Sequence, residues 1–375
     1  MSGRADVAVI GGGILGLSHA WAMAKRGKKV VLFERGLRAS GASIRNFGMV
    51  WPIGQPAGMM HQTALRSAAL WREVLTAAKL PFFPTGSLHV GYHEDEAEVL
   101  REFAEKGPAA GYPCAWQNPA QILERSDAIR PDGLRGGLWS ETEMTVDPRR
   151  VIAGLPEYLT ELGVEIHFGE AVRRIQLPVI ETARGAWEVD QAIVCSGDDF
   201  ETLYPELFAV SGLIRCKLQM MRTAPQPDHW QLGPALAAGL TLRFYKAFRL
   251  CASLESLKAR VAREKAPYDE WAIHVLVSQT ADGAITLGDS HEYSQTVDIF
   301  DRADVDDLIL REAETFLQLP DWRIAQRWHG IYCQHPEKPF FEAEPEPGVH
   351  ILTGVGGSGM TLSFGLAERT AENIL

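Results

Sequence analysis

The sequence contains no uninterrupted apolar run that approaches the roughly 20 residues needed to span a bilayer as a helix. Basic residues are also scarce, because 37 Lys and Arg stand against 48 Asp and Glu and leave a formal net charge of −11. Such a chain has no general field that would attract nucleic acid or an anionic lipid surface. We therefore expect neither nucleic acid nor a membrane among its partners.

Cysteine is equally sparse. The five cysteines are widely spaced, odd in number and form no C-x-x-C pair. This pattern argues against a disulfide framework and against a zinc site, and it favours a reducing compartment. We expect a cytoplasmic protein without a metal.

The 375 residues exceed what one hydrophobic core usually fills, while 46% hydrophobic and 23% charged residues are ordinary for a globular protein. We therefore expect about two domains. One domain, built from residues 1–79, 147–214 and 325–375, would bind a nucleotide. A second, built from residues 80–146 and 215–324, would be inserted into it and hold a mostly antiparallel sheet for the substrate.

The most informative stretch runs from Val7 to Arg35 and has the pattern of a strand, a tight turn, a helix and a second strand. Its apolar run is too broken by glycine, and its basic cluster comes too late, for a signal peptide. Gly11, Gly13 and Gly16 form a G-x-G-x-x-G set, and Glu34 follows Gly16 by 18 positions. This combination predicts a βαβ dinucleotide fold.

Each residue type in this motif has a physical reason. Gly11 permits the turn, Gly13 lets the backbone approach a pyrophosphate, and Gly16 lets the helix pack closely on the strand. The start of the helix, at Ile14 and Leu15, offers unpaired N–H groups to the phosphates. Glu34 can accept hydrogen bonds from both ribose hydroxyls and would repel a 2′-phosphate, so NADP is disfavoured, while the motif leaves NAD and FAD open.

We expect two further small-residue segments and one more loop to contact the nucleotide. The loop after Glu34 combines small residues with donors suited to phosphate or to a polar ring edge. A buried strand ends in Cys195-Ser-Gly197, and the strand Val349–Thr353 runs into a glycine cluster before a C-terminal helix. The loop residues concerned are Arg35, Ser40, Ala42, Ser43, Arg45, Asn46, Phe47, Gly48 and Met49.

In the second domain, alternation over Thr241–Leu250 predicts a strand with Arg243 and Tyr245 on its polar face. That face would meet either solvent or a ligand. The fold class we predict is α/β, α+β overall: a Rossmann-like nucleotide-binding domain with an inserted antiparallel-sheet domain.

Three glycine-rich turns at the start, middle and end of one chain suit an extended cofactor, FAD, better than NAD. Here the chain resembles the D-amino acid oxidase, glycine oxidase and sarcosine oxidase superfamily of FAD-dependent oxidoreductases. The resemblance covers nearly the whole length. It is carried by Val9–Gly16, Ser40–Met49, Ile193–Gly197, Trp328–Tyr332 and Gly354–Met360.

The resemblance implies oxidation of a small amine. A hydride would pass from the carbon beside the nitrogen to the flavin, the imine would hydrolyse, and O₂ would usually reoxidise the cofactor. It also places Val172 near the adenine and Met49, Gly357 and Met360 near the flavin ring. The remaining cofactor residues that we expect are Cys195, Ser196, Gly197, Gly330, Gly356, Ser358, Gly359 and Thr361.

Two departures from the family pattern are informative. Gly330 stands where covalent-flavin sarcosine oxidases carry a cysteine, so we expect FAD to be held non-covalently, with Cys333 close by. Tyr332 stands where glycine and D-amino acid oxidases carry an arginine that grips the substrate carboxylate. An α-amino acid would therefore lose its main anchor.

The loop Arg45–Trp51 and the segment around His329 and Tyr332 resemble a subgroup that oxidises aminophosphonates such as 2-aminoethylphosphonate and its N-methyl derivative. A tetrahedral phosphonate can be held by several separate donors. Alternation puts Tyr332 and Gln334 on one strand face and His329 on the other, where it can be a plain core histidine. The candidate substrate-site residues are Met49, Trp51, Arg243, Tyr245, His329, Tyr332 and Gln334.

Three alternatives stay open at this point: an oxidase of glycine, sarcosine or another small amino acid, a NAD-dependent dehydrogenase, and a flavin-binding subunit without turnover.

Overall fold

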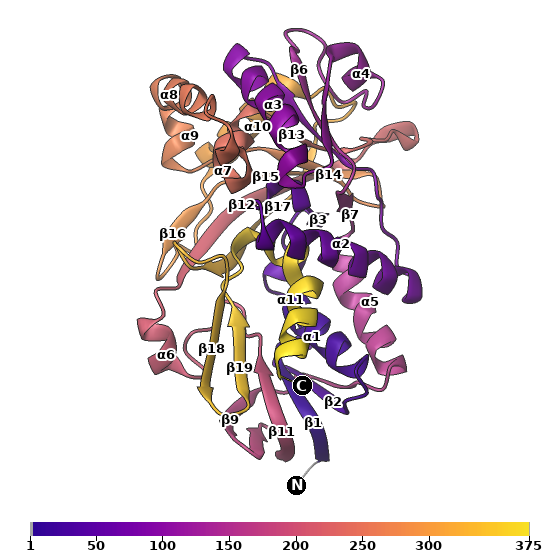
Figure 1. The fold of residues 1–375 in the computed structure, drawn as a ribbon, viewed down its shortest axis with the longest axis vertical. Helices are drawn as coiled ribbons and strands as arrows, with labels where there is room; N and C mark the ends of the chain where they lie inside the picture. The colour runs from indigo at the N-terminus through magenta and orange to yellow at the C-terminus, as the bar shows by residue number, and fades with distance from the viewer. Residues whose placement is uncertain (1–2, 375) are drawn as a thin grey trace.

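The computed structural model describes residues 3–374, and its strands form two large sheets. Figure 1 shows the first sheet in the lower half of the view and the second in the upper half, joined by long strands. Within the described residues, no helix is both long and apolar enough to cross a membrane. The predicted mixed α/β architecture is confirmed.

The first sheet is a mostly parallel sheet built around the opening strand. β1 pairs in parallel with β2 on one side and β11 on the other, and its near-continuous apolar sequence fits a strand covered on both faces. The strand order is β18 (Phe341–Glu346), β19 (Val349–Thr353), β11 (Ala186–Val194), β1 (Gly3–Ile10), β2 (Val30–Glu34) and β8 (Glu165–Phe168), with β9 (Val172–Gln176) and β10 (Val179–Thr182) attached through β11.

Helices far apart in sequence cover one face of this sheet. The C-terminal helix, yellow in Figure 1, lies beside the first helix, so the two ends of the chain share one core. Phe364 meets Trp21 and Trp71 edge-on, with ring centroids 5.4 and 4.8 Å apart. These helices are α1 (Ile14–Ala24), α2 (Met59–Ala77), α5 (Pro148–Glu161) and α11 (Gly359–Ile374), with the short α6 (Pro205–Val210) elsewhere.

The second sheet is mostly antiparallel, with one parallel pair, β13 with β4. Its order is β16 (Glu292–Ser294), β12 (Ile214–Pro225), β15 (Ala284–Gly288), β14 (Leu276–Gln279), β13 (Ala235–Ala237), β4 (Ser87–Gly91), β6 (Gly136–Ser140) and β5 (Cys114–Gln117), and β17 (Ile324–Gln334) also pairs with β12. A small separate ladder joins β3 (Met49–Val50) to β7 (Met144–Thr145).

The helices of the upper half pack on this sheet and bury aromatic side chains such as Phe103, Phe248 and Phe316. They are α3 (Glu94–Lys106), α4 (Pro119–Leu123), α7 (Gly239–Phe244), α8 (Leu254–Glu264), α9 (Ala266–Glu270) and α10 (Ala303–Phe316). The 3₁₀ helices are η1 (Ala42–Ile44), η2 (Pro52–Gly54), η3 (Pro108–Ala110), η4 (Pro227–His229), η5 (Lys246–Leu250) and η6 (Gly356–Ser358).

The prediction of a strand over Thr241–Leu250 is wrong, because this stretch forms the end of α7 and then η5. The N–H of Tyr245 donates to the carbonyl of Thr241 at 3.3 Å, and Leu242 and Phe248 are buried all the same. A short apolar run buries its residues equally well in a strand or in helical turns, so its pattern does not separate the two.

The pairing of β17 bears on the predicted domain bounds. β17 pairs along its length with β12 of the second sheet, although the predicted bound at residue 325 assigned it to the first domain. We keep the domain bounds as a proposal in which β17 joins the two parts.

Candidate active site

A cavity of about 740 Å³ is lined by residues of both sheets. Ile10 and Glu34 reach it from the ends of β1 and β2, and Cys195 follows the end of β11. Leu276 and Gly330 enter from the second sheet. The cavity therefore lies at the carboxyl ends of the parallel strands, where open α/β sheets bind ligands.

Most of the residues that the sequence predicted for the site line this one cavity. From the opening turn, β2 and the following loop these are Gly11, Gly13, Ile14, Leu15, Glu34, Arg35, Ser40, Ala42, Ser43, Arg45, Asn46, Phe47, Met49 and Trp51. From the rest of the chain they are Val172, Cys195, Ser196, Gly197, Tyr245, Gly330, Tyr332, Gln334, Gly356, Gly357, Ser358, Gly359, Met360 and Thr361.

The opening turn is shaped for close backbone approach. Gly11 has φ of 109°, and a Cβ there would lie 2.3 Å from the carbonyl oxygen of Cys195. Gly13 is the N-cap of α1 and gives the helix no side-chain cap, while the N–H of Ile14 donates to Ser43 Oγ at 2.9 Å. This helix start faces the cavity with its positive dipole end.

Glu34 is held rigidly at the end of β2. One carboxylate oxygen accepts from the N–H of Gly12 and the other from the N–H of Gly36, both at 2.8 Å. A carboxylate oxygen has more than one acceptor site, so each keeps capacity toward the cavity. The position fits the ribose contact expected of this residue.

Hydrogen bonds tie the last glycine turn to the loop after β2. The N–H of Trp51 donates to Thr361 Oγ1 at 3.0 Å, and Gln55 Nε2 donates to Ser358 Oγ at 3.0 Å. Trp71 Nε1 donates to the carbonyl of Met360 at 2.7 Å. Segments more than 280 residues apart thus form one rim, as the sequence predicted for an extended cofactor.

Two predicted cofactor residues do not line the cavity. Gly16 packs α1 on β1, since a Cβ there would lie 1.8 Å from the carbonyl oxygen of Gly11. Gly48 has φ of 71°, and a Cβ there would lie 1.9 Å from the carbonyl oxygen of Val146. Both glycines shape the backbone around the site rather than its surface.

Tyr245 and Tyr332 both line the cavity, and Tyr332 borders the last glycine turn. The hydroxyl of Tyr332 lies 3.8 Å from where a Cβ of Gly357 would be. Burial raises the pKa of both tyrosines above its ordinary value. Both hydroxyls therefore stay protonated at neutral pH and can donate hydrogen bonds.

Arg243 and His329 lie outside the cavity lining, contrary to the sequence-based prediction. Arg243 pairs with Asp269 at 2.9 Å and donates to the carbonyl of Ile273 at 3.0 Å, because the helical turn aims it away from Tyr245. His329 Nδ1 lies 2.9 Å from Asp301 Oδ1, on the face of β17 opposite Tyr332, as strand alternation requires.

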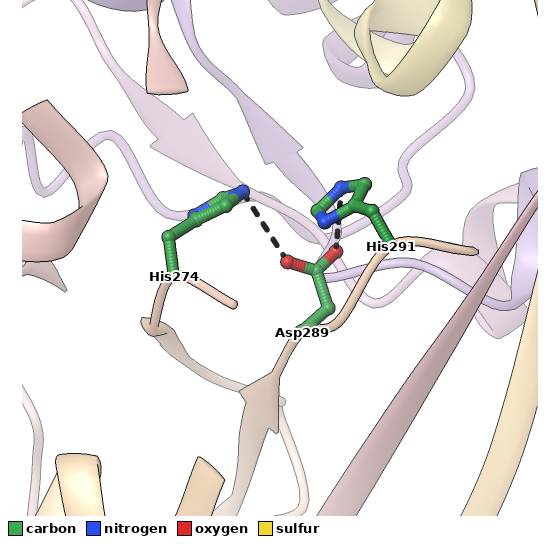
Figure 2. Close-up of side chains that lie close together, drawn as sticks. All are labelled: His274, Asp289 and His291. Carbon is green, nitrogen blue, oxygen red and sulfur yellow. Dashed lines mark ion pairs between the residues drawn. The ribbon is translucent and has the colours of Figure 1, made fainter. Parts of the chain in front are cut away.

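The cavity lining also holds residues that the sequence analysis did not single out, among them His274, Asp289 and His291, which Figure 2 shows with the carboxylate between the two imidazoles. His274 Nε2 lies 3.4 Å from Asp289 Oδ1, and His291 Nε2 lies 3.8 Å from Asp289 Oδ2. His274 precedes β14 and Asp289 follows β15, and their backbones hydrogen-bond to each other, so pairing those strands as an antiparallel hairpin would have brought the two residues close together.

Burial dominates the electrostatics of this trio. It lowers the pKa of His291 to about 4, lowers that of His274 well below its usual value, and raises that of Asp289. The ring of Phe244 covers both imidazoles, with centroid distances of 3.9 and 4.6 Å. We call Phe244, Tyr245, His274, His291, Tyr293 and Tyr332 the aromatic wall.

A rigid acidic residue beyond a G-x-G-x-x-G turn, together with one cavity lined by three distant small-residue turns, defines a dinucleotide-binding protein with an adjoining substrate space. The family model for FAD dependent oxidoreductases matches residues 6–373, and the chain belongs to that family. The expected superfamily and its FAD cofactor are confirmed.

Two curated relatives and one solved structure show the level of similarity. Glycine oxidase of Geobacillus kaustophilus is 24% identical over 209 residues, a match that spans about half of each chain, 52% of this one and 55% of the relative. An opine oxidase subunit of Rhizobium meliloti is 21% identical over 98% of this chain and 93% of its own. The solved structure of the Geobacillus glycine oxidase superposes with a TM-score of 0.78 at 19% identity, covering 99% of this chain and 94% of that chain.

Proposed function

We propose that this protein oxidises a small primary or secondary amine that carries an acid group. The substrate that we propose is an aminophosphonate such as 2-aminoethylphosphonate or its N-methyl derivative. Bound FAD would accept the hydride from the carbon beside the nitrogen, and hydrolysis of the imine would give an aldehyde with ammonia or methylamine. O₂ would then reoxidise the cofactor.

One observation carries the choice of acid group. Among residues 3–374, the arginines that line the cavity are Arg35 and Arg45, both from the loop after β2, and the lysines that line it, Lys246 and Lys338, have no planar fork. Arg35 also forms an ion pair with Asp199. A planar carboxylate is normally gripped by one arginine fork, whereas a tetrahedral phosphonate is satisfied by several separate donors.

The wall offers such donors. The hydroxyls of Tyr245 and Tyr332 are protonated donors in a space shielded by Phe244, and charge-assisted hydrogen bonds to an oxyanion are stronger than neutral ones. They would hold the acid group and so fix the amine carbon relative to the flavin. Met49, Trp51 and Gln334 would close the sides of this space.

The names of relatives support the amine class more broadly. The Geobacillus protein oxidises glycine by its name, and the Rhizobium protein is part of an opine oxidase. An oxidase of glycine or sarcosine is the second candidate, because a glycine oxidase is among the relatives. That match covers only about half of each chain.

Anaerobic flavin reduction tests the proposal. The purified protein would be mixed without oxygen with 2-aminoethylphosphonate, its N-methyl derivative, glycine and sarcosine, and with glycerol 3-phosphate as an alcohol that carries a similar acid group. We expect the two aminophosphonates to bleach the flavin. Bleaching by glycine or sarcosine alone would replace the phosphonate with a carboxylate, and bleaching by glycerol 3-phosphate alone would refute the amine.

A further inference from the structure

The trio of His274, Asp289 and His291 stands on rigid backbone at the cavity wall. The N–H of His274 donates to the carbonyl of Asp289 at 3.2 Å, and the N–H of Asp289 donates back at 2.8 Å. The N–H of His291 donates to the carbonyl of Trp271 at 2.8 Å. These bonds fix where the three side chains start, and all three residues are buried.

The spacing within the trio does not fit hydrogen bonds. N–H···O bonds join heavy atoms about 2.7–3.2 Å apart. The two nitrogen-to-oxygen distances here are 3.4 and 3.8 Å, and one ligand atom from each residue lies within 4.8 Å of the others. A tetrahedral metal with bonds of about 2.0–2.2 Å separates its ligand atoms by about 3.3–3.6 Å. The distance of 3.4 Å fits this range, whereas ligand atoms that are 3.8 Å or up to 4.8 Å apart would close in around the ion.

A hydrogen bond to the backbone carbonyl of Ala272 fixes the tautomer of His291. Its Nδ1 lies 3.1 Å from the carbonyl oxygen of Ala272, and since a carbonyl only accepts, Nδ1 carries the proton. In the neutral ring Nε2 then carries a lone pair, and it lies 3.8 Å from Asp289 Oδ2, too far for a hydrogen bond whichever of the two atoms carries a proton. A metal-bound histidine commonly donates its other nitrogen to a backbone carbonyl in this way.

Buried polar atoms in the trio also lack partners. Within residues 3–374, both nitrogens of His274 and Oδ1 of Asp289 have no hydrogen-bond partner. Leaving such atoms unpaired in a buried site is costly. A cation between the three side chains would satisfy His274 Nε2, Asp289 Oδ1 and the His291 lone pair together.

We propose that His274, Asp289 and His291 bind a divalent transition-metal ion whose open coordination positions face the cavity and receive the acid group of the substrate. Two imidazoles and a carboxylate suit zinc or iron, and three protein ligands leave room for an exogenous one. The ion would carry the positive charge that the wall lacks in arginine. The second half of this proposal rests on the proposed function, whereas the first half does not.

Zinc binding tests the site directly. The FAD-loaded protein would be treated with a chelator, freed of it, and dialysed against Zn²⁺, with zinc and flavin per chain measured together. We expect one zinc per chain, with binding weakened in Asp289→Asn and His291→Ala by more than the ~10–100-fold that loss of an outer partner costs. Asp301→Asn removes the carboxylate of the similar His329–Asp301 pair outside the cavity and should bind zinc normally.

The wild-type measurement keeps the test decisive even if a variant fails to fold. A flavin-saturated wild-type protein that retains neither Zn²⁺, Fe²⁺ nor Mn²⁺ would overturn the site and leave a metal-free trio. Methylphosphonate, which cannot be oxidised as an amine, probes the open positions. It should perturb the flavin spectrum at lower concentration with zinc bound, and equal affinity with and without zinc would overturn the substrate half.

These outcomes are separate from the fate of the proposed function. If no amine bleaches the flavin, the zinc stoichiometry still stands or falls by itself. If aminophosphonates bleach the flavin of a zinc-free protein at full rate, the ion does not receive the acid group, so the substrate half of the metal proposal fails while the proposed function holds.

Discussion

Gly16 lies so close to Gly11 that a Cβ on Gly16 would come within 1.8 Å of the carbonyl oxygen of Gly11. Gly16→Ala must therefore push α1 away from β1, and overpacking of this kind costs about 1–3 kcal/mol or more. We expect lower thermal stability and less FAD per chain. Glu157→Ala is the control, because Glu157 is exposed on α5 and does not line the cavity. Equal flavin content in the two variants would contradict this account.

The opening unit was predictable from sequence because all its determinants are local. The glycine spacing, the helix that follows and Glu34 lie within 29 residues, and each has one physical interpretation. The C-terminal turn was also predictable, since a strand, glycines and a helix follow in order. The structure adds that both turns meet at one cavity.

The sequence-based predictions were wrong or incomplete where contacts between distant segments determine the local structure. Thr241–Leu250 has an apolar pattern compatible with a strand, yet local hydrogen bonds and packing in the cluster around Phe103 make it helical. That change of element turned Arg243 away while Tyr245 kept its place on the cavity. His274 and Asp289 come together only where the backbones that flank β14 and β15 hydrogen-bond to each other, and single residues do not encode that pairing.

Glu34 provides a second test of the nucleotide site. Glu34→Gln puts an amide NH₂ against the N–H of Gly12 or Gly36, where the carboxylate accepts at 2.8 Å from both. Losing one charge-assisted bond costs about 1.5–3 kcal/mol, so FAD affinity should fall ~10- to 100-fold. Glu157→Gln, on the exposed side of α5, should leave the affinity unchanged. Titration of apoprotein with FAD measures both, and an unaltered Kd in Glu34→Gln would exclude Glu34 from the ribose contact.

Tyr332→Phe tests the acid-group contact on the aromatic wall. We expect substrate affinity to fall ~10- to 100-fold, the loss of one hydrogen bond to a charged group, with flavin content unchanged. Tyr92→Phe is the matched control, because that hydroxyl donates to the carbonyl of Arg130 at 2.6 Å outside the cavity lining. The concentration of amine that half-saturates anaerobic flavin reduction is the measurement. Loss of flavin in Tyr332→Phe would instead make Tyr332 structural.

His89 gives a prediction for acid stability. Burial lowers its pKa to about 3, and neither ring nitrogen has a partner among residues 3–374. In the unfolded chain the pKa is about 6.5, so below that pH the unfolded state takes up a proton that the folded state refuses. The free energy of unfolding then falls by about 1.4 kcal/mol per pH unit as the pH drops toward 3.

His89→Leu should remove that part of the acid sensitivity. The difference in the free energy of unfolding between the variant and wild type should shift by about 2 kcal/mol in favour of the variant as the pH falls from about 8 to about 5. Urea unfolding of the FAD-saturated proteins measures this difference. His229→Asn is the control, because His229 is exposed and asparagine tolerates its positive φ of 58°. Parallel curves for wild type and His89→Leu would show that His89 does not set the acid limit.

Cys333 is the candidate residue for a covalent bond to FAD, and its surroundings predict that no such bond forms. Gly330, which the resemblance to covalent-flavin sarcosine oxidases aligns with their cysteine, has no side chain, and a Cβ there would lie 3.1 Å from the carbonyl oxygen of Arg45. Cys333 also reaches the cavity, but its thiol donates to the carbonyl of Gly197 at 3.1 Å and lies 3.2 Å from Thr353 Oγ1. Burial raises the pKa of Cys333 to about 11, so the nucleophilic thiolate is absent at neutral pH. Acid precipitation should therefore leave colourless protein and release all the FAD, from wild type and from Cys333→Ser alike. Yellow wild-type precipitate together with colourless Cys333→Ser precipitate would identify Cys333 as a covalent attachment point.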